Sequence, residues 1–265
     1  MPAVGPLRFA KYEGLGNDFV VVDAERDDAI DAARAARVCD RRFGVGADGV
    51  ILVLPARDPA CAARMRVINA DGSVPEMCGN GLRCAVLHLA LRRGVTSLEV
   101  VFETDAGPRA CAATVNGWTA DVTVDMGEVR DLGDLELDVD GRKRTLALGD
   151  AGNPHAILWD ERDVDGLGPR IATHAAFPRG TNVEFASIAR GGIDVIVWER
   201  GVGRTLACGT GACAVAVVAR RRGLVAPTGG VEVRLPGGAL VIDPAPQGRT
   251  RMRGPARRVF EGTIP

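Results

Sequence analysis

Two stretches of this chain are near copies of each other: CGNGLRCAVLHLALRRG at residues 78–94 and CGTGACAVAVVARRRG at residues 208–223. Each begins with a cysteine, passes through a Gly-x-Gly and continues in apolar residues until it reaches arginines and a glycine. This pattern predicts buried helices over Gly79–Arg93 and Gly209–Arg222, each with a cysteine at its start. The copies begin 130 residues apart in a chain of 265, which indicates a duplicated chain that folds as two similar halves.

The repeat extends upstream of both cysteines. Asn69 lies nine residues before Cys78, and Glu199 lies nine residues before Cys208. Each polar residue ends an apolar, strand-like run, at residues 65–68 and 195–198 respectively. Both halves therefore share one order: a strand, a polar residue, a loop, a cysteine and a helix.

Short strands separated by turn residues account for most of the remaining chain, and a third helix is predicted over Asp28–Cys39, after the capping residue Asp27. Asp140-Gly141 indicates a hairpin turn within the strand-like region 129–148. We therefore predict an α+β fold of two pseudo-symmetric lobes, each a curved, mainly antiparallel sheet wrapped around a central helix. The N-terminal lobe, residues 1–118, carries Cys78, and the C-terminal lobe, residues 119–254, carries Cys208.

The composition argues against several classes of protein. Hydrophobic residues make up 46% and charged residues 25% of the chain, and the net charge is −1. There is no basic excess for nucleic acid and no polybasic run for a membrane surface, and the apolar runs are too short to span a bilayer. The N-terminus lacks a secretory signal pattern, so we expect a cytoplasmic protein.

The seven cysteines do not form a disulfide or zinc pattern. Their number is odd, no pair has the Cys-x-x-Cys spacing, and only three histidines are present. Free thiols in a reducing compartment fit better, and no metal site is expected. A packing role is expected for five of them, Cys39, Cys61, Cys84, Cys111 and Cys213.

The other two, Cys78 and Cys208, stand where a thiol can react. A cysteine at a helix start lies beside unpaired N–H groups and the positive end of the helix dipole, which favour the thiolate and lower its pKa. The same N–H groups can hold a carboxylate and stabilise charge on the adjacent carbon. Two such thiols on one substrate, in a site between the lobes, could remove a proton from one face of a carbon and return it to the other.

A third glycine-rich motif, at residues 44–49, matches the Gly-x-Gly-x-x-Gly pattern of dinucleotide-binding proteins. That fingerprint requires a strand before it and a helix after it. Here the order is reversed, because the motif follows a predicted helix and leads into the predicted strand 50–54. A turn or a loop near the site is the better interpretation.

Taken together, these segments resemble the diaminopimelate epimerases, which are amino acid epimerases that do not use pyridoxal phosphate. The matching blocks occur in the family's order and cover nearly the whole chain: YEGLGNDF at 12–19, RFGVGADG at 42–49, NADGS at 69–73, CGNG at 78–81, GNPH at 152–155, RGTNVEF at 179–185, ERGVG at 199–203 and ACGTG at 207–211. One departure is Gly49, where some relatives carry glutamine.

The resemblance implies cofactor-independent epimerisation of L,L-diaminopimelate to meso-diaminopimelate, in lysine and peptidoglycan precursor synthesis. Cys78 and Cys208 would exchange roles as acid and base. The resemblance also implies that the final strand, about residues 255–265, returns to the first lobe. It assigns the other residues as follows: Gly79, Asn80, Gly209 and Thr210 hold the reacting carboxylate; Asn17, Asn69, Asn153, Asn182, Glu199 and Arg200 bind the substrate; His155 and Glu199 tune the thiols.

Three alternatives remain open at this point. A proline or hydroxyproline racemase would use the same two thiols on a smaller substrate. A thiol redox or metal-binding protein is less consistent with the second cysteine of each repeat lying within a buried helix. A binding protein of the same fold without activity is the third alternative. The small-molecule substrate is the only partner that the sequence implies, and the choice between a monomer and a homodimer is left open.

Overall fold

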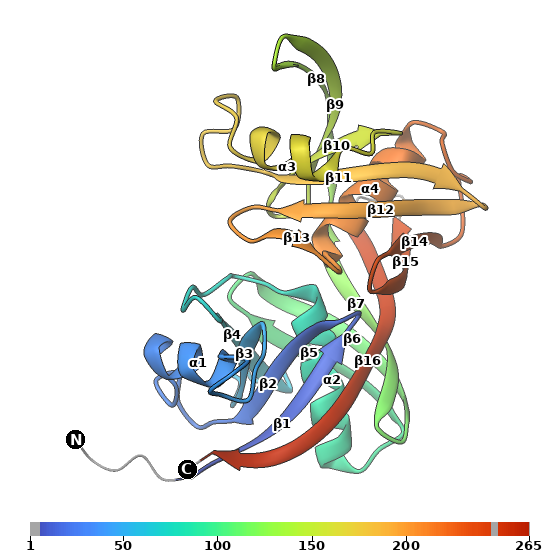
Figure 1. Ribbon diagram of the computed structural model, residues 1–265. Coiled ribbons are helices and arrows are strands. Elements are labelled where there is room, and N and C mark those ends of the chain that lie inside the picture. The colour runs from blue at the N-terminus through green and yellow to red at the C-terminus, as the bar shows by residue number, and fades with distance from the viewer. Residues whose placement is uncertain (1–5, 245–248, 265) are drawn as a thin grey trace. The chain divides into compact units, whose positions relative to one another are not determined.

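The computed structural model describes residues 6–244 and 249–264, which form sixteen strands and four helices (Figure 1). The chain divides into two compact units. The first contains the described residues of Met1–Val124 and Gly254–Pro265, and the second is made of those of Asp125–Arg253. Each unit combines a mostly antiparallel sheet with two helices, so the predicted α+β class with two lobes is confirmed.

The first unit places its strands side by side in chain order, with α2 packed on β1, β2 and β6. The pairs β2–β3 and β4–β5 are parallel, and each is joined through a helix, as parallel neighbours require. Its elements are β1 (Leu7–Gly14), β2 (Asn17–Asp23), α1 (Ala32–Cys39), β3 (Gly49–Leu54), β4 (Ala63–Asn69), α2 (Gly79–Arg93), β5 (Ser97–Thr104) and β6 (Gly107–Asn116).

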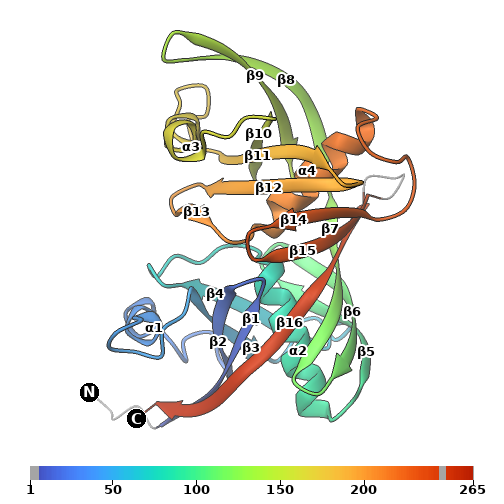
Figure 2. The ribbon, with the colours of Figure 1, turned by 45° about the vertical axis from the view of Figure 1, so that its right-hand side comes forward.

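The second unit repeats this arrangement. Its parallel pairs are β10–β11, joined through α3, and β12–β14, joined through α4, which lies behind β11 and β12 in the view of Figure 2. Its elements are β8 (Arg130–Val139), β9 (Arg142–Asp150), β10 (Pro154–Trp159), α3 (Val164–Ala172), β11 (Asn182–Ala189), β12 (Gly192–Glu199), β13 (Gly203–Thr205), α4 (Gly209–Arg221), β14 (Val231–Leu235) and β15 (Gly238–Pro244).

Two long strands, β7 (Thr119–Glu128) and β16 (Arg249–Ile264), contain residues of both units. Within the first unit β16 runs antiparallel to β1, from Leu7 opposite Ile264 to Glu13 opposite Arg257. Figure 1 shows these two strands side by side. The last strand of the chain therefore completes the sheet that begins with the first.

The two repeated helices are buried as their sequences predict. Every residue of α2 from Gly79 to Ala90 is buried, and α4 is buried from Gly211 to Ala219. Gly94 ends α2 in the left-handed conformation, with φ 65°. No described helix combines the length and the apolar character needed to cross a bilayer.

The structure differs from the sequence expectations at α1, α3 and β10, and the short strand β13 was not predicted either. Helix α1 begins at Ala32 and is capped by Asp31, not Asp27. Helix α3 was not predicted, because Gly166, Gly168 and Pro169 resemble helix breakers. A Cβ at Gly168 would lie 2.8 Å from the Trp198 ring, so this glycine admits the indole. Strand β10 was also not predicted, and it buries His155 at 1% exposure.

Candidate active site

Cys78 and Cys208 occupy the same position at the start of α2 and α4. Both are N-cap residues with extended backbone, at φ −137° and ψ 108° for Cys78 and φ −124° and ψ 112° for Cys208. The N–H of Gly81 donates to the Cys78 sulfur at 3.3 Å, and that of Gly211 donates to the Cys208 sulfur at 3.4 Å. Each sulfur thus takes the place that a serine or aspartate oxygen usually fills at a helix start.

The second glycine of each Gly-x-Gly is closely packed, more so at Gly211 than at Gly81. A Cβ at Gly81 would lie 3.1 Å from the side chain of Ile51 and 3.4 Å from the Cys78 sulfur. A Cβ at Gly211 would lie 2.6 Å from Oε1 of Glu184. The glycines therefore allow another side chain to pack directly on the turn that carries the thiol.

Around Cys78, the predicted residues Asn17 and Asn80 are joined in one network. The Asn80 amide nitrogen donates to the Asn17 carbonyl oxygen at 3.2 Å, and the Asn17 amide nitrogen donates to Asp48 at 2.7 Å. The fully buried Arg83 donates to the Asn80 carbonyl oxygen at 3.0 Å and to the backbone oxygen of Pro255 at 3.0 Å. Both amides are thereby held by charged groups.

Ion pairs support this network from β1 and from the loop after α1. Asp18 is paired with Lys11 at 2.7 Å and with Arg41 at 2.8 Å, and Arg41 also reaches Asp48 at 2.7 Å. Burial would raise the pKa of Asp18, but hydrogen bonds from Arg41 and Lys11 outweigh it and lower the pKa to about 2. Lys11 additionally donates to the backbone oxygen of Gly46, within the glycine-rich motif.

Asn69 makes a different contact from the other two asparagines of this unit. Its side chain donates to the Ser73 hydroxyl at 2.9 Å, in the loop that leads to Cys78. Gly49 lies opposite Asn69 in the β3–β4 pair, and a Cβ at Gly49 would lie 2.9 Å from the backbone oxygen of Ile68. On this backbone a side chain at position 49 would clash with that oxygen.

Around Cys208, four polar side chains form a continuous chain of hydrogen bonds. The Thr210 hydroxyl lies 3.4 Å from the Cys208 sulfur and accepts from the Asn153 amide nitrogen at 3.3 Å. Nε2 of His155 lies 2.9 Å from the Asn153 carbonyl oxygen, and its Nδ1 lies 2.7 Å from Glu184. The predicted residues Asn153, His155 and Thr210 are thus linked, and Glu184 extends the chain.

The expectation of a lowered thiol pKa is wrong for Cys208. Burial raises the pKa of Cys208 well above 9.0, and the carboxylates of Glu199 and Glu184 raise it further. Hydrogen bonds from Thr210 and Gly211 act in the opposite direction but are outweighed. In the free protein Cys208 is therefore a thiol, although it stands at a helix start.

Three further contacts involve predicted residues of the second unit. The Asn182 carbonyl oxygen accepts from the backbone N–H of Arg200 at 3.0 Å, and its amide nitrogen donates to the backbone oxygen of Pro154. Glu199 accepts from the Thr205 hydroxyl at 2.6 Å. Asn182 thereby connects the start of β10 with the residue that follows β12.

Three charged residues that contact these groups directly were not assigned a role from the sequence: Asp48, Arg83 and Glu184. A signal existed for Arg83 and Glu184, because each is a charged residue within an apolar run that forms a buried element. No comparable signal marks Asp48, whose role depends on the pairing of β2 with β3.

All seven cysteines are free thiols, as the sequence predicts. Burial raises the pKa of Cys39 to about 11 and raises that of Cys84 further. Within the described ranges, no group of three or more histidine, cysteine, aspartate or glutamate side chains gathers in a way that could hold a metal ion.

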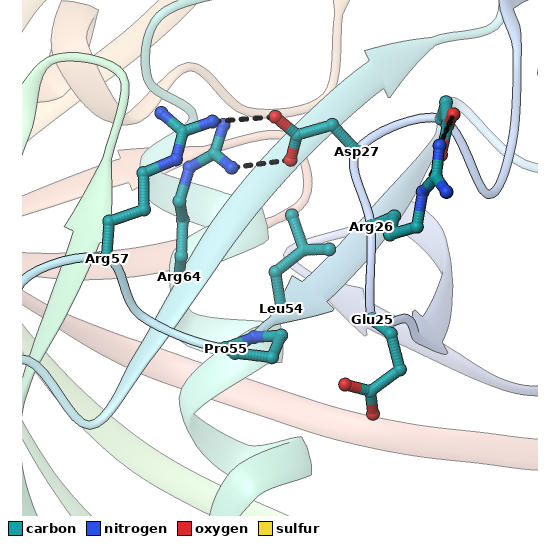
Figure 3. A pocket seen from close by; sticks show the side chains of 8 residues that line it. Glu25, Arg26, Asp27, Leu54, Pro55, Arg57 and Arg64 are labelled. Atoms are coloured by element: carbon teal, nitrogen blue, oxygen red, sulfur yellow. Dashed lines mark hydrogen bonds and ion pairs between the residues drawn. The ribbon is translucent and has the colours of Figure 1, made fainter.

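A separate cavity of about 430 Å³ lies beside the end of β3 and contains none of the predicted site residues. Figure 3 shows Arg57 and Arg64 pointing to the carboxylate of Asp27, which they contact at 2.7 and 2.5 Å. Arg26 is paired with Asp28 at 2.6 Å. The cations of this cavity are thus already neutralised by the protein's own carboxylates.

The sequence also matches known proteins over nearly its whole length. The family model for diaminopimelate epimerase matches residues 9–132 and 148–259. A diaminopimelate epimerase from Desulforudis audaxviator is 45% identical over 97% of this chain and 98% of its own, and one from Desulfitobacterium hafniense is 42% identical over the same shares.

Solved structures with the same fold include a predicted epimerase from Pseudomonas aeruginosa, with a TM-score of 0.76, 18% identity and coverage of 97% of this chain and 99% of that one. A probable proline racemase from Agrobacterium radiobacter has a TM-score of 0.74 and 18% identity over 98% of this chain and 93% of its own. At these identities the structures support the fold alone. The family model and the relatives, which span nearly the whole chain, show that this protein belongs to the diaminopimelate epimerase family.

Proposed function

We propose that this isomerase converts L,L-diaminopimelate to meso-diaminopimelate, with Cys78 and Cys208 as its two proton carriers. The observation that carries the proposal is the equivalence of the two thiols. Each is the N-cap of the buried helix of its own unit, and each accepts a hydrogen bond from the second glycine of a Gly-x-Gly. A reaction that exchanges the two faces of a carbon needs two such groups.

The proton balance follows from one thiolate and one thiol. The thiolate takes the α-proton, and the electron pair of the C–H bond is left on the α-carbon and its carboxylate. The thiol on the other face then donates its proton to that carbon and becomes the thiolate. Burial and two carboxylates raise the pKa of Cys208 and so favour its protonated form in the free protein; we therefore assign the donated proton to Cys208 for one handedness of the substrate, and the two cysteines exchange roles for the other.

The helix starts supply the stabilisation that this step needs. We assign the backbone N–H groups of Gly79, Asn80, Gly209 and Thr210 to the reacting carboxylate, where they oppose the developing charge. The far end of diaminopimelate carries a second amino group and a second carboxylate. For it we propose four amide side chains, a guanidinium that also donates to the backbone oxygen of Arg179 at 3.0 Å, and one carboxylate acceptor: Asn17, Asn69, Asn153, Asn182, Arg200 and Glu199.

The free cysteines indicate in which compartment the enzyme works. Seven free cysteines suit a reducing compartment, so we propose that the enzyme works in the cytoplasm.

The first experiment follows L,L-diaminopimelate in deuterated water. The expected product is meso-diaminopimelate that carries one solvent deuterium at the inverted carbon, because the donated proton comes from a thiol that exchanges with solvent. Cys78→Ser and Cys208→Ser should each abolish inversion, whereas Cys61→Ser should retain it, since Cys61 lies at no helix start.

Two results would change the proposal in different ways. Near-normal inversion by either serine variant of Cys78 or Cys208 would contradict the two-thiol scheme. Exchange with proline or another amino acid, and none with diaminopimelate, would retain the scheme and replace the substrate.

A further inference from the structure

We propose that Glu184 is a positioning residue that, through His155 and Asn153, keeps the Thr210 hydroxyl donating to the Cys208 sulfur. The inference rests on the proposed function of Cys208 and extends it to a residue of β11 that lies 24 positions away in the sequence. It concerns the state of the free enzyme, so it can be tested without substrate.

The contacts form one unbranched path from the carboxyl group to the sulfur. Glu184 and His155 have no exposed side-chain surface, and their atoms Oε1 and Nδ1 lie 2.7 Å apart. The path continues from His155 Nε2 to the Asn153 carbonyl oxygen at 2.9 Å, and from the Asn153 amide nitrogen to the Thr210 oxygen at 3.3 Å. It ends at the Cys208 sulfur, 3.4 Å from that oxygen.

The chemistry of these atoms gives the path a direction. The Asn153 oxygen can only accept, so Nε2 of His155 must carry a hydrogen and donate it. The Asn153 nitrogen can only donate, so Thr210 accepts there and its own hydrogen is left for the sulfur. Each hydrogen bond between His155 and Cys208 therefore has its donor on the His155 side and its acceptor on the Cys208 side.

Glu184 selects this direction in either of two proton distributions. When Glu184 is a carboxylate, it accepts from Nδ1 and His155 is an imidazolium that also donates from Nε2. When Glu184 is protonated, it donates to Nδ1, and the hydrogen of the neutral ring must then reside on Nε2. Both distributions make the pair neutral overall, and both leave Nε2 as the donor.

The reverse direction requires a less stable arrangement. It needs an ionised Glu184 beside a neutral ring that carries its hydrogen on Nδ1, which leaves one negative charge with no exposed surface. Among residues 6–244 and 249–264, Oε2 of Glu184 has no hydrogen-bond partner, so this charge would be poorly compensated. An uncompensated buried carboxylate costs several kcal/mol in real proteins, and the neutral pair avoids that cost.

Packing fixes Glu184 against the helix that carries the thiol. A Cβ at Gly211 would lie 2.6 Å from Oε1, so the carboxyl group rests on the first turn of α4. Glu184 therefore touches the same turn to which its hydrogen-bond path leads. Glu184 thus constrains both the N-cap position of Cys208 and the orientation of the Thr210 hydroxyl.

The test measures alkylation of the Cys208 peptide by mass spectrometry against pH, in reduced, ligand-free enzyme. Thr210→Val removes the hydroxyl, so the pH at half-maximal rate should rise by about one unit, equivalent to about a tenfold loss of rate at fixed pH. Glu184→Leu should raise the midpoint by less than Thr210→Val, because the His155 ring loses the partner that holds its hydrogen on Nε2 while Cys208 also loses one of the two carboxylates that raise its pKa. Glu232→Leu, on an exposed side chain of β14, is the control and should leave the midpoint unchanged.

Two further variants separate positioning from charge and from folding. Glu184→Gln can donate its amide hydrogen to Nδ1 but lacks the charge of the carboxylate, so its midpoint should lie at or slightly below that of the unchanged protein. The double variant Glu184→Leu, Thr210→Val should have a midpoint no higher than that of Thr210→Val alone, because both changes act on the same bond and the loss of a carboxylate does not raise the pKa of Cys208. Glu199, the other carboxylate that raises the Cys208 pKa, is retained in all variants.

A direct spectroscopic readout needs no substitution that could impair folding. In protein labelled with ¹⁵N at its three histidines, Nε2 of His155 should carry a hydrogen. A His155 ring protonated on Nδ1 alone would overturn the proposal, as would a Glu184→Gln midpoint shifted as far as that of Glu184→Leu. If instead Cys78→Ser and Cys208→Ser both remained active in the inversion assay while these results held, the proposed two-thiol function would be wrong and the positioning role of Glu184 would be retained.

Discussion

At the scale of single residues, Cys78 and Cys208 share a backbone geometry but not an environment. Cys208 is 6% exposed and lies near two carboxylates, whereas Cys78 is only half-buried and follows an exposed loop. A helix start contributes less than about 1 kcal/mol to an anion, which is under one pKa unit, while burial can shift a pKa by several units. Burial therefore determines the state of Cys208.

This comparison shows what the sequence could predict at this scale. The positions of both thiols followed from the Gly-x-Gly and the apolar run after each cysteine. The raised pKa of Cys208 did not, because it depends first on burial and then on Glu199 and Glu184, which lie on strands distant from Cys208 in the sequence. A local motif predicts the position of a reactive group, whereas its pKa depends on burial and on residues from strands distant in the sequence.

Asp48 provides a test of the network around Cys78. Asp48→Ala removes the acceptor for the Asn17 amide nitrogen and for the backbone N–H of Asp18, at 2.7 and 3.1 Å. Without it, the proposed substrate contact of Asn17 loses its orientation, and a hydrogen bond to a charged group is worth about 1.5–3 kcal/mol. We expect KM for diaminopimelate to rise by about tenfold with kcat within about twofold, as measured by steady-state kinetics.

Two further variants test whether the change in KM comes from the lost acceptor at Asp48. Asp48→Asn retains a carbonyl oxygen for Asn17 and should fall between Asp48→Ala and the unchanged enzyme. Asp58→Ala, whose side chain accepts only within its own exposed loop in the described contacts, should leave KM unchanged. A KM unaffected by Asp48→Ala would remove Asn17 from the proposed binding residues.

At the scale of secondary structure elements, prediction succeeded where the signal is local. The starts of α2 and α4 were predicted to the residue, and the turn at Asp140-Gly141 joins β8 to β9, with positive φ at both residues. Helix α3 and strand β10 were missed because tertiary contacts determine them. The absence of a side chain at Gly168 leaves space for the Trp198 ring, and β10 is hydrogen-bonded to its parallel neighbour β11.

The first turns of α2 and α4 offer a matched pair of substitutions. Gly211→Ala brings a methyl group to 2.6 Å from Glu184, so the buried carboxyl group or the cap must move. Gly81→Ala meets the terminal methyl of Ile51 at 3.1 Å, which can shift slightly. Alanine gains up to about 1 kcal/mol of helix propensity, while overpacking costs about 1–3 kcal/mol.

We therefore expect Gly211→Ala to lower the free energy of unfolding by about 1–2 kcal/mol and Gly81→Ala to change it by less than about 1 kcal/mol. Urea denaturation at pH 7 measures both. Equal costs in the two helices would show that the Glu184 contact does not govern the turn at Gly211.

At the scale of the whole molecule, the two units repeat one order of elements. In each, a helix joins the first parallel pair of strands and the thiol-bearing helix joins the second. The duplication was visible in the sequence because the helices and their caps are continuous segments. The polar networks were not, because their members are far apart in the chain: His155 and Glu184 lie 29 residues apart, and Arg83 and Pro255 lie 172 residues apart.

Buried protonated groups in both units make alkaline pH the condition under which the fold should weaken first. Burial raises the pKa of Cys39 to about 11 and raises the pKa values of Cys84 and Cys208 further, while an unfolded cysteine ionises near pH 8.5. A raised pKa in the folded state means that the unfolded chain releases its proton first. The contribution of each thiol is therefore complete below about pH 8.5 and is lost as pH rises towards the folded pKa.

Between about pH 9 and 10.5 each of these three thiols should lower the free energy of unfolding by about 1.4 kcal/mol per pH unit, or about 4 kcal/mol per unit together. Urea denaturation in the presence of reductant, at several pH values from 7 to 10.5, gives this slope. Cys84→Ala should reduce it by about one third, whatever the cavity costs at pH 7. Val86→Ala makes a cavity in the same buried helix without removing a thiol, so it should lower stability at every pH and leave the slope unchanged. The same slope in Cys84→Ala and Val86→Ala would show that ionisation of the buried thiols does not limit alkaline stability.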